Sequence, residues 1–146
     1  FIALLILYPQ SWKKIIPKID YKNFSAELPK KVYKFIQSCY TMDECKTRER
    51  CETRDKVLLC LEKKLSYDEI KKVKFLLLEI ENRYKNVEID KILLDIEDMS
   101  SRIIKERQEK IKFDFAHEIS LAEQNGDRKK VKKLLEELQH AIKEKK

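Results

Sequence analysis

Residues 119–138 read ISLAEQNGDRKKVKKLLEEL, and they combine a helix end and a helix start within three residues. Gly126 can take the left-handed conformation that commonly ends a helix, and Asp127 can cap the N-terminus of the next helix. The chain thus has the means to fold back at Gly126, and the sequence predicts an antiparallel helical hairpin. The two apolar stripes then match in register, with Ala122 near Val131, Ile119 near Leu134 and Leu135, Phe115 near Leu138, and Ile111 near Ile142.

Upstream of this hairpin, apolar residues at helical spacing indicate a compact multi-helix bundle. Ser66 and Glu69 form the S-x-x-E capping box that starts one of its helices. In that helix Phe75, Leu76 and Leu78 add apolar surface outside the main stripe, so we expect it to be packed all round as the axis of the core. The stripes are Leu28, Val32, Phe35, Ile36 and Cys39; Val57, Leu58, Leu61 and Leu65; Ile70, Val73, Leu77, Ile80 and Tyr84; and Ile89, Ile92, Leu93, Ile96 and Met99.

We therefore expect an all-α protein in two parts. Residues 1–99 form the helical bundle subdomain, and residues 100–146 form the C-terminal hairpin. Ser100 and Ser101 offer a place where the last helix of the bundle can end, bend or be capped again. If that helix instead continues from Glu88 into the hairpin, one long helix joins the two parts.

The composition favours helices and excludes several kinds of site. The chain has 146 residues but only one glycine and three prolines. These are too few to form glycine-rich phosphate loops or a set of tight β-hairpins. The apolar start, residues 1–8, is too short to span a membrane and lacks the basic segment of a signal peptide. We therefore expect a cytoplasmic protein with no membrane partner. The absence of an initial Met suggests a chain cut from a longer one.

The titratable residues predict no catalytic residue, no cofactor and no metal site. His117 and His140 do not face each other across the predicted hairpin, and we expect both on the surface. Asp95 and Asp98 are three residues apart beside a core stripe, which is an ordinary pairing on a helix.

The four cysteines fit no common zinc or redox motif. Cys39, Cys45, Cys51 and Cys60 are separated by five, five and eight residues. We expect free thiols in a reducing compartment, with a Cys45–Cys51 pairing as the alternative.

Two features of the predicted hairpin suggest partner binding. Five cations crowd the first turns of its second helix, where the helix dipole favours acids and each exposed cation costs about 0.3–1 kcal/mol. Either this run is solvated and relieved by Glu136 and Glu137, or it meets an acidic partner. Phe113 faces away from the hairpin seam, so it either packs on the core or anchors an interface. The cations are Arg128, Lys129, Lys130, Lys132 and Lys133.

Three groups of residues resemble the C-terminal region of DnaG-type primases, and the resemblance covers essentially the whole chain. The leucine patterns are common in helical proteins, whereas an acid-x-x-Gly-Asp turn after a compact helical domain is more specific. The groups are the L-L-x-x-x-P element of Leu4, Leu5 and Pro9; the Val32-Tyr33-x-Phe35-Ile36 stripe; and the ending Ala122-Glu123-x-x-Gly126-Asp127 with Leu134, Leu135 and Leu138.

The resemblance implies a non-catalytic domain that docks a primase on the N-terminal domains of the hexameric replicative helicase. The hairpin would be the main docking element. The helical subdomain would be similar in fold to the helicase N-terminal domain and would help to stimulate the helicase, while primer synthesis belongs to other regions of such primases. The implied contacts are Phe113, Leu121, Arg128, Lys129, Lys132 and Lys133 near the hairpin tip, and Gln139, His140 and Lys143 near the terminus.

Two alternatives stand beside this interpretation. The first is the N-terminal domain of the replicative helicase itself, although the charged ending Glu144-Lys145-Lys146 suits a natural C-terminus. The second is a basic helical module that binds nucleic acid, because the formal net charge is +7. Against the second, acids are interspersed along the chain and no aromatic residues alternate with the basic run, so nucleic acid is not expected to be the main partner.

Overall fold

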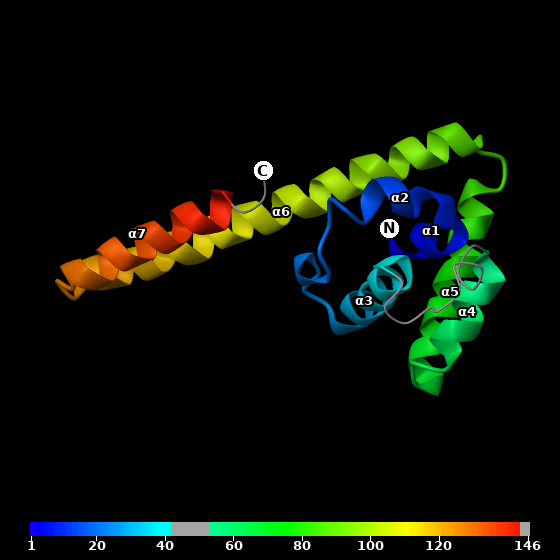
Figure 1. Cartoon of the computed structure of the whole chain (residues 1–146), viewed down its shortest axis with the longest axis horizontal. Helices are drawn as coiled ribbons and strands as arrows, with labels where there is room; N and C mark the ends of the chain where they lie inside the picture. Colours follow the sequence, from blue (N-terminus) through cyan, green and yellow to red (C-terminus); the bar gives the residue numbers. More distant parts are fainter. Residues whose placement is uncertain (42–52, 144–146) are drawn as a thin grey trace. The chain divides into compact units, whose positions relative to one another are not determined.

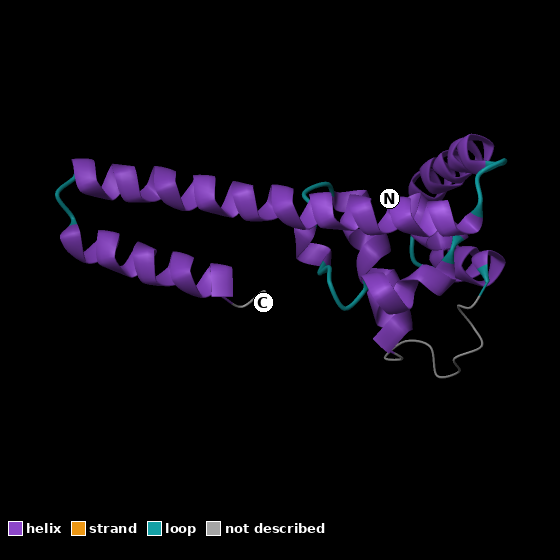
Figure 2. Ribbon diagram, turned by 90° about the horizontal axis from the view of Figure 1, so that it is seen from above, coloured by secondary structure: helices purple, strands orange, loops and turns teal. Residues whose placement is uncertain are grey.

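The computed structural model describes residues 1–41 and 53–143, with side chains up to residue 141. Within these residues every regular element is a helix (Figure 2), which confirms the predicted all-α class. The chain divides into two compact units, unit 1 (Phe1–Ile103) and unit 2 (Ile104–Lys146). The elements in Figure 1 are α1 (Ile2–Leu7), η1 (Pro9–Ser11), α2 (Trp12–Ile15), η2 (Tyr21–Asn23), α3 (Glu27–Thr41), α4 (Arg54–Glu62), α5 (Tyr67–Tyr84), α6 (Ile89–Gln124) and α7 (Arg128–Lys143), where η marks a short 3-10 helix.

The centre of unit 1 is the short helix α1. Its sequence, IALLIL, contains no polar side chain, and Leu4, Leu5 and Ile6 are completely buried. Helix α1 packs against α3, α4 and α5. Because it carries no charge, α1 can be covered on every side without the desolvation cost that a charged helix would bear.

The prediction that α5 is packed all round is wrong. Phe75, Leu76 and Leu78 are 67%, 46% and 59% exposed. Lysine and glutamate side chains share these sides of the helix, so covering the three apolar residues would also bury charges. The helix instead buries a single stripe made of Ile70, Val73 and Leu77.

The start of α5 is the capping box that the sequence predicts. The Glu69 amide donates to the Ser66 hydroxyl at 3.3 Å, and the Ser66 amide donates to the Glu69 carboxylate at 3.0 Å. Lys31 of α3 adds an ion pair to the same carboxylate at 2.7 Å. Glu69 thus joins the N-terminus of α5 to α3.

Two buried aromatic side chains connect the N-terminal segments of unit 1. The Trp12 indole donates to the Leu5 carbonyl at 2.8 Å, and the Tyr33 hydroxyl donates to the Ile19 carbonyl at 3.1 Å. Burial, with a smaller effect from the charge of Asp20, raises the pKa of Tyr33 well above its ordinary value. Both polar groups are therefore satisfied inside the core.

Helix α6 has 36 residues and continues through both serines that offered a possible end. The Ser100 and Ser101 hydroxyls donate to the Glu97 carbonyl at 2.8 and 3.0 Å. Such bonds back to the preceding turn are compatible with a continuing helix. The division between the two units falls inside α6 at Ile103, rather than at residue 99.

Unit 2 turns at Gly126, whose φ of 67° is in the left-handed region. The Gly126 amide donates to the Glu123 carbonyl at 3.0 Å, and the Asp127 amide donates to the Ala122 carbonyl at 2.9 Å. The Asp127 carboxylate then accepts the Lys130 amide at 3.0 Å and caps α7. Both views show α7 running back alongside the second half of α6 (Figures 1 and 2).

Candidate partner-binding surface

A narrow apolar seam holds the two helices of unit 2 together. Ala122 and Leu134 are buried, while Phe115, Ile119, Val131 and Leu138 are half-buried. The Ile142 side chain lies outside the described residues. Leu135, which the sequence placed in the seam, is 46% exposed. It follows Leu134 by about 100° around α7, which takes it to the edge of the seam.

Phe113 is an exposed aromatic on α6. Its side chain is 73% exposed, so it lies outside the seam of unit 2. Leu121, eight residues further on, is also exposed. Both residues lie on sides of α6 away from the seam, as helical spacing requires. Exposed aromatic side chains of this kind often contribute most of the binding energy when a partner covers them.

The basic run at the start of α7 is only partly relieved by its own acids. Lys133 pairs with Glu137 at 3.5 Å, and both side chains are exposed. The pairing of Lys132 with Glu136 is not formed. In the part of the chain that the structure describes, the other four cations of the run have no carboxylate in ion-pair contact. They lie where the helix dipole is positive, so a carboxylate from a partner would stabilise this end of α7.

The structure places eight of the nine candidate residues in three stripes. Residues three or four positions apart share a side of a helix. On this basis Arg128, Lys132 and Gln139 share one flank of α7, and Lys129, Lys133 and His140 share the side of α7 opposite the seam, while Phe113 and Leu121 belong to α6. The Lys143 side chain lies outside the described residues.

The stripe of Arg128, Lys132 and Gln139 has an apolar centre that sequence reasoning missed. Leu135 lies between Lys132 and Gln139 at spacings of three and four residues, so cations and one exposed leucine form a continuous stripe. The signal was present in the sequence, since Leu134 and Leu135 cannot both face one narrow seam.

The remaining titratable residues singled out in the sequence are two histidines and two aspartates. His117, His140 and Asp98 are exposed. Burial and a hydrogen bond to Asp95 raise the pKa of Tyr84, so Asp95 has a half-buried partner in unit 1. Among the described residues, no group of three or more His, Cys, Asp or Glu side chains is placed to hold a metal ion.

Two of the four cysteines lie within the described residues. Cys39 is buried, and Cys60 is a half-buried free thiol. Cys45 and Cys51, and with them the alternative pairing, lie outside the described residues. None of the helices in residues 1–41 and 53–143 combines the length and apolar character needed to cross a membrane.

Comparison with known proteins adds no relative. No family model matches the chain, and no curated protein and no solved structure matches it either. The class that the fold and the surface define is an all-α protein with an exposed aromatic side chain and unpaired cations on a pair of antiparallel helices.

Proposed function

We propose that this chain is the helicase-interaction domain of a DnaG-type primase, with unit 2 as its docking hairpin. The supporting observation is the outer surface of unit 2, where Phe113 is 73% exposed and the first turns of α7 carry unpaired cations. The proposal assigns unit 1 the role of helical bundle subdomain and gives this domain no catalytic step. It also implies action in the bacterial cytoplasm at the replication fork.

The chemistry of this surface suits a partner that offers an apolar pocket bordered by carboxylates. Burying an aromatic side chain such as Phe113 contributes about 1.5–3 kcal/mol. Carboxylates placed near Arg128 and Lys132 would relieve the repulsion between these cations and the dipole of α7. The helicase N-terminal domains are the partner that the sequence resemblance implies.

A binding titration of the intact chain against the N-terminal region of the replicative helicase from the same organism tests this proposal. We expect saturable binding that weakens about tenfold or more in Phe113→Ala, and likewise in the double variant Arg128→Glu, Lys132→Glu. Lys112→Glu is the matched control, because Lys112 is exposed on α6 outside the three stripes. Absence of binding by the intact chain would remove the helicase from consideration.

The unpaired cations also favour a second candidate function, namely nucleic-acid binding. In that case the affinity for single-stranded DNA would fall steeply with salt, without any helicase present. Arg128→Glu, Lys132→Glu would weaken it, whereas Phe113→Ala would leave it unchanged, since Phe113 does not lie among these cations. The third possibility, that the chain is a helicase N-terminal domain, predicts self-association into rings, which sedimentation equilibrium measures.

A further inference from the structure

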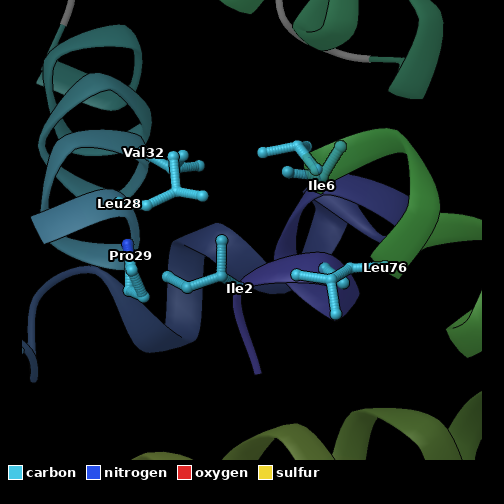
Figure 3. A pocket seen from close by; sticks show the side chains of 8 residues that line it. Ile2, Ile6, Leu28, Pro29, Val32 and Leu76 are labelled. Carbon is cyan, nitrogen blue, oxygen red and sulfur yellow. The ribbon is translucent and has the colours of Figure 1, made fainter. Parts of the chain in front are cut away.

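Unit 1 contains an apolar cavity between α1, α3 and α5 (Figure 3). The cavity has a volume of about 100 Å³. Leu28 and Val32 of α3 face Ile2 and Ile6 of α1 across it. An engineered apolar cavity of about 150 Å³ stays dry and binds benzene, so this smaller cavity suits one aliphatic side chain. Its lining is Ile2, Ala3, Ile6, Leu28, Pro29, Val32, Val73 and Leu76.

A wider, open hollow of about 630 Å³ adjoins the cavity. Leu28 and Leu76 line both the cavity and the hollow. Phe75 forms another apolar part of its wall. Phe75 and Leu76 are two of the three outer residues of α5 that the sequence predicted to be buried, and the exposure of these two is explained if another chain covers them. The cavity and the hollow together are called the α3–α5 groove below.

The charged wall of this groove is basic. Lys71, Lys72 and Asp68 line it, which gives two cations against one carboxylate. In the described part of the chain neither lysine has an ion-pair partner. The glutamates of α5 have their own cations: Glu69 pairs with Lys31, Glu79 with Arg83, and Glu81 with Arg54. The two lysines are therefore available to carboxylates from outside.

We propose that the α3–α5 groove binds an acidic segment of a partner protein, which inserts one apolar side chain into the cavity beside Leu28 and Leu76. Carboxylates of that segment lie against Lys71 and Lys72. A second copy of this chain is the less suitable occupant, because its net charge of +7 opposes approach to a basic wall. The proposal concerns unit 1 alone, so it stands or falls separately from docking through unit 2.

Three short fluorescein-labelled peptides test the chemistry of the occupant by fluorescence anisotropy with the intact chain. The first has one leucine among aspartates and glutamates, the second has alanine in place of the leucine, and the third has lysines in place of the acids. We expect the first to bind at least about tenfold tighter than either of the others. Equal affinity for all three peptides would overturn the proposal.

Variants of the chain locate the binding site. Leu76→Glu, and separately Lys71→Glu with Lys72→Glu, should weaken binding of the first peptide about tenfold or more. Leu94→Glu is the control for an added charge at an exposed leucine, because Leu94 is 64% exposed in unit 1 and lines neither the cavity nor the hollow. Circular dichroism checks that each variant keeps its helices.

Methyl NMR of the unaltered chain gives a second readout that does not depend on any variant folding. The first peptide should shift the methyl signals of Leu28 and Val73, which line the cavity, and leave those of Leu94 unchanged. Shifts confined to unit 2 would contradict the proposal. So would self-association of the chain that Leu76→Glu abolishes, since it would make a second copy the occupant.

Discussion

Replacing Leu134 by alanine should release α7 from α6, whereas the same replacement at Leu135 should not. Leu134 is 6% exposed and Leu135 is 46% exposed, although the two are neighbours in one helix. Truncating a buried leucine costs about 2–5 kcal/mol. In the described residues of unit 2 the buried side chains are Ala122 and Leu134, so Leu134 is the largest group to lose. We expect a cost of about 3 kcal/mol at Leu134 and below about 1 kcal/mol at Leu135.

Amide hydrogen exchange of α7 measures this difference directly, because separation of the helices exposes its amides to solvent. Since 1.4 kcal/mol corresponds to a factor of ten, protection should fall by about a hundredfold in Leu134→Ala and by less than about fivefold in Leu135→Ala. Both variants replace a leucine by alanine in a helix interior, so the change in helix propensity is the same in both and slightly favours the helix. Amides of α5 serve as the internal control. Equal loss of protection in the two variants would refute the assignment of Leu134 to the seam.

Three further predictions concern the turn, a pH-sensitive contact and the core. Gly126→Ala should destabilise unit 2 by about 1–2 kcal/mol in urea unfolding, because φ is 67° and no atom lies within 4 Å of the added methyl, so the cost is purely conformational. The ion pair with Lys31 and the capping hydrogen bonds at the start of α5 lower the pKa of Glu69 from 4.5 to about 2, so their stabilisation is present above pH 4.5 and is lost as the pH falls towards 2. In Glu69→Gln the melting temperature should therefore vary less between pH 4.5 and pH 2 than it does in the unaltered chain. The same pH dependence in both would count against the contact. Trp12→Phe removes the hydrogen bond to the Leu5 carbonyl and leaves that acceptor buried, which should cost about 1–3 kcal/mol and lower the melting temperature.

The sequence was informative where local chemistry determines the conformation. The helix ends at Gly126 and the capping box at Ser66 follow from residues that bond to their near neighbours, so no knowledge of the rest of the fold is needed. The all-α class follows in the same way from the near absence of glycine and proline and from helical periodicity.

The sequence was misleading where the partner of an apolar side chain had to be inferred. Periodicity shows that Phe75 and Leu76 are apolar and on a helix, but burial depends on whether another element covers that side. In this chain α1, rather than α5, is the helix that its neighbours surround, and the outer side chains of α5 stay exposed. Leu135 was misplaced for the same reason, since a seam one residue wide accepts Leu134 and excludes its neighbour.

The cations of α7 and the cavity of the α3–α5 groove would hold a partner by different forces, and these forces respond differently to salt. The cations at the start of α7 are exposed and lie around a helix terminus, so a contact made there is mainly electrostatic and weakens as ionic strength rises. The α3–α5 groove places its cavity at the centre and two lysines on the wall, so burial of an apolar side chain supplies much of its affinity. That contribution does not diminish with added salt. A partner whose affinity falls steeply with salt is thus expected to rely on the cations of α7, and one whose affinity changes little is expected to bury an apolar group, either in the cavity beside Leu76 or against Phe113.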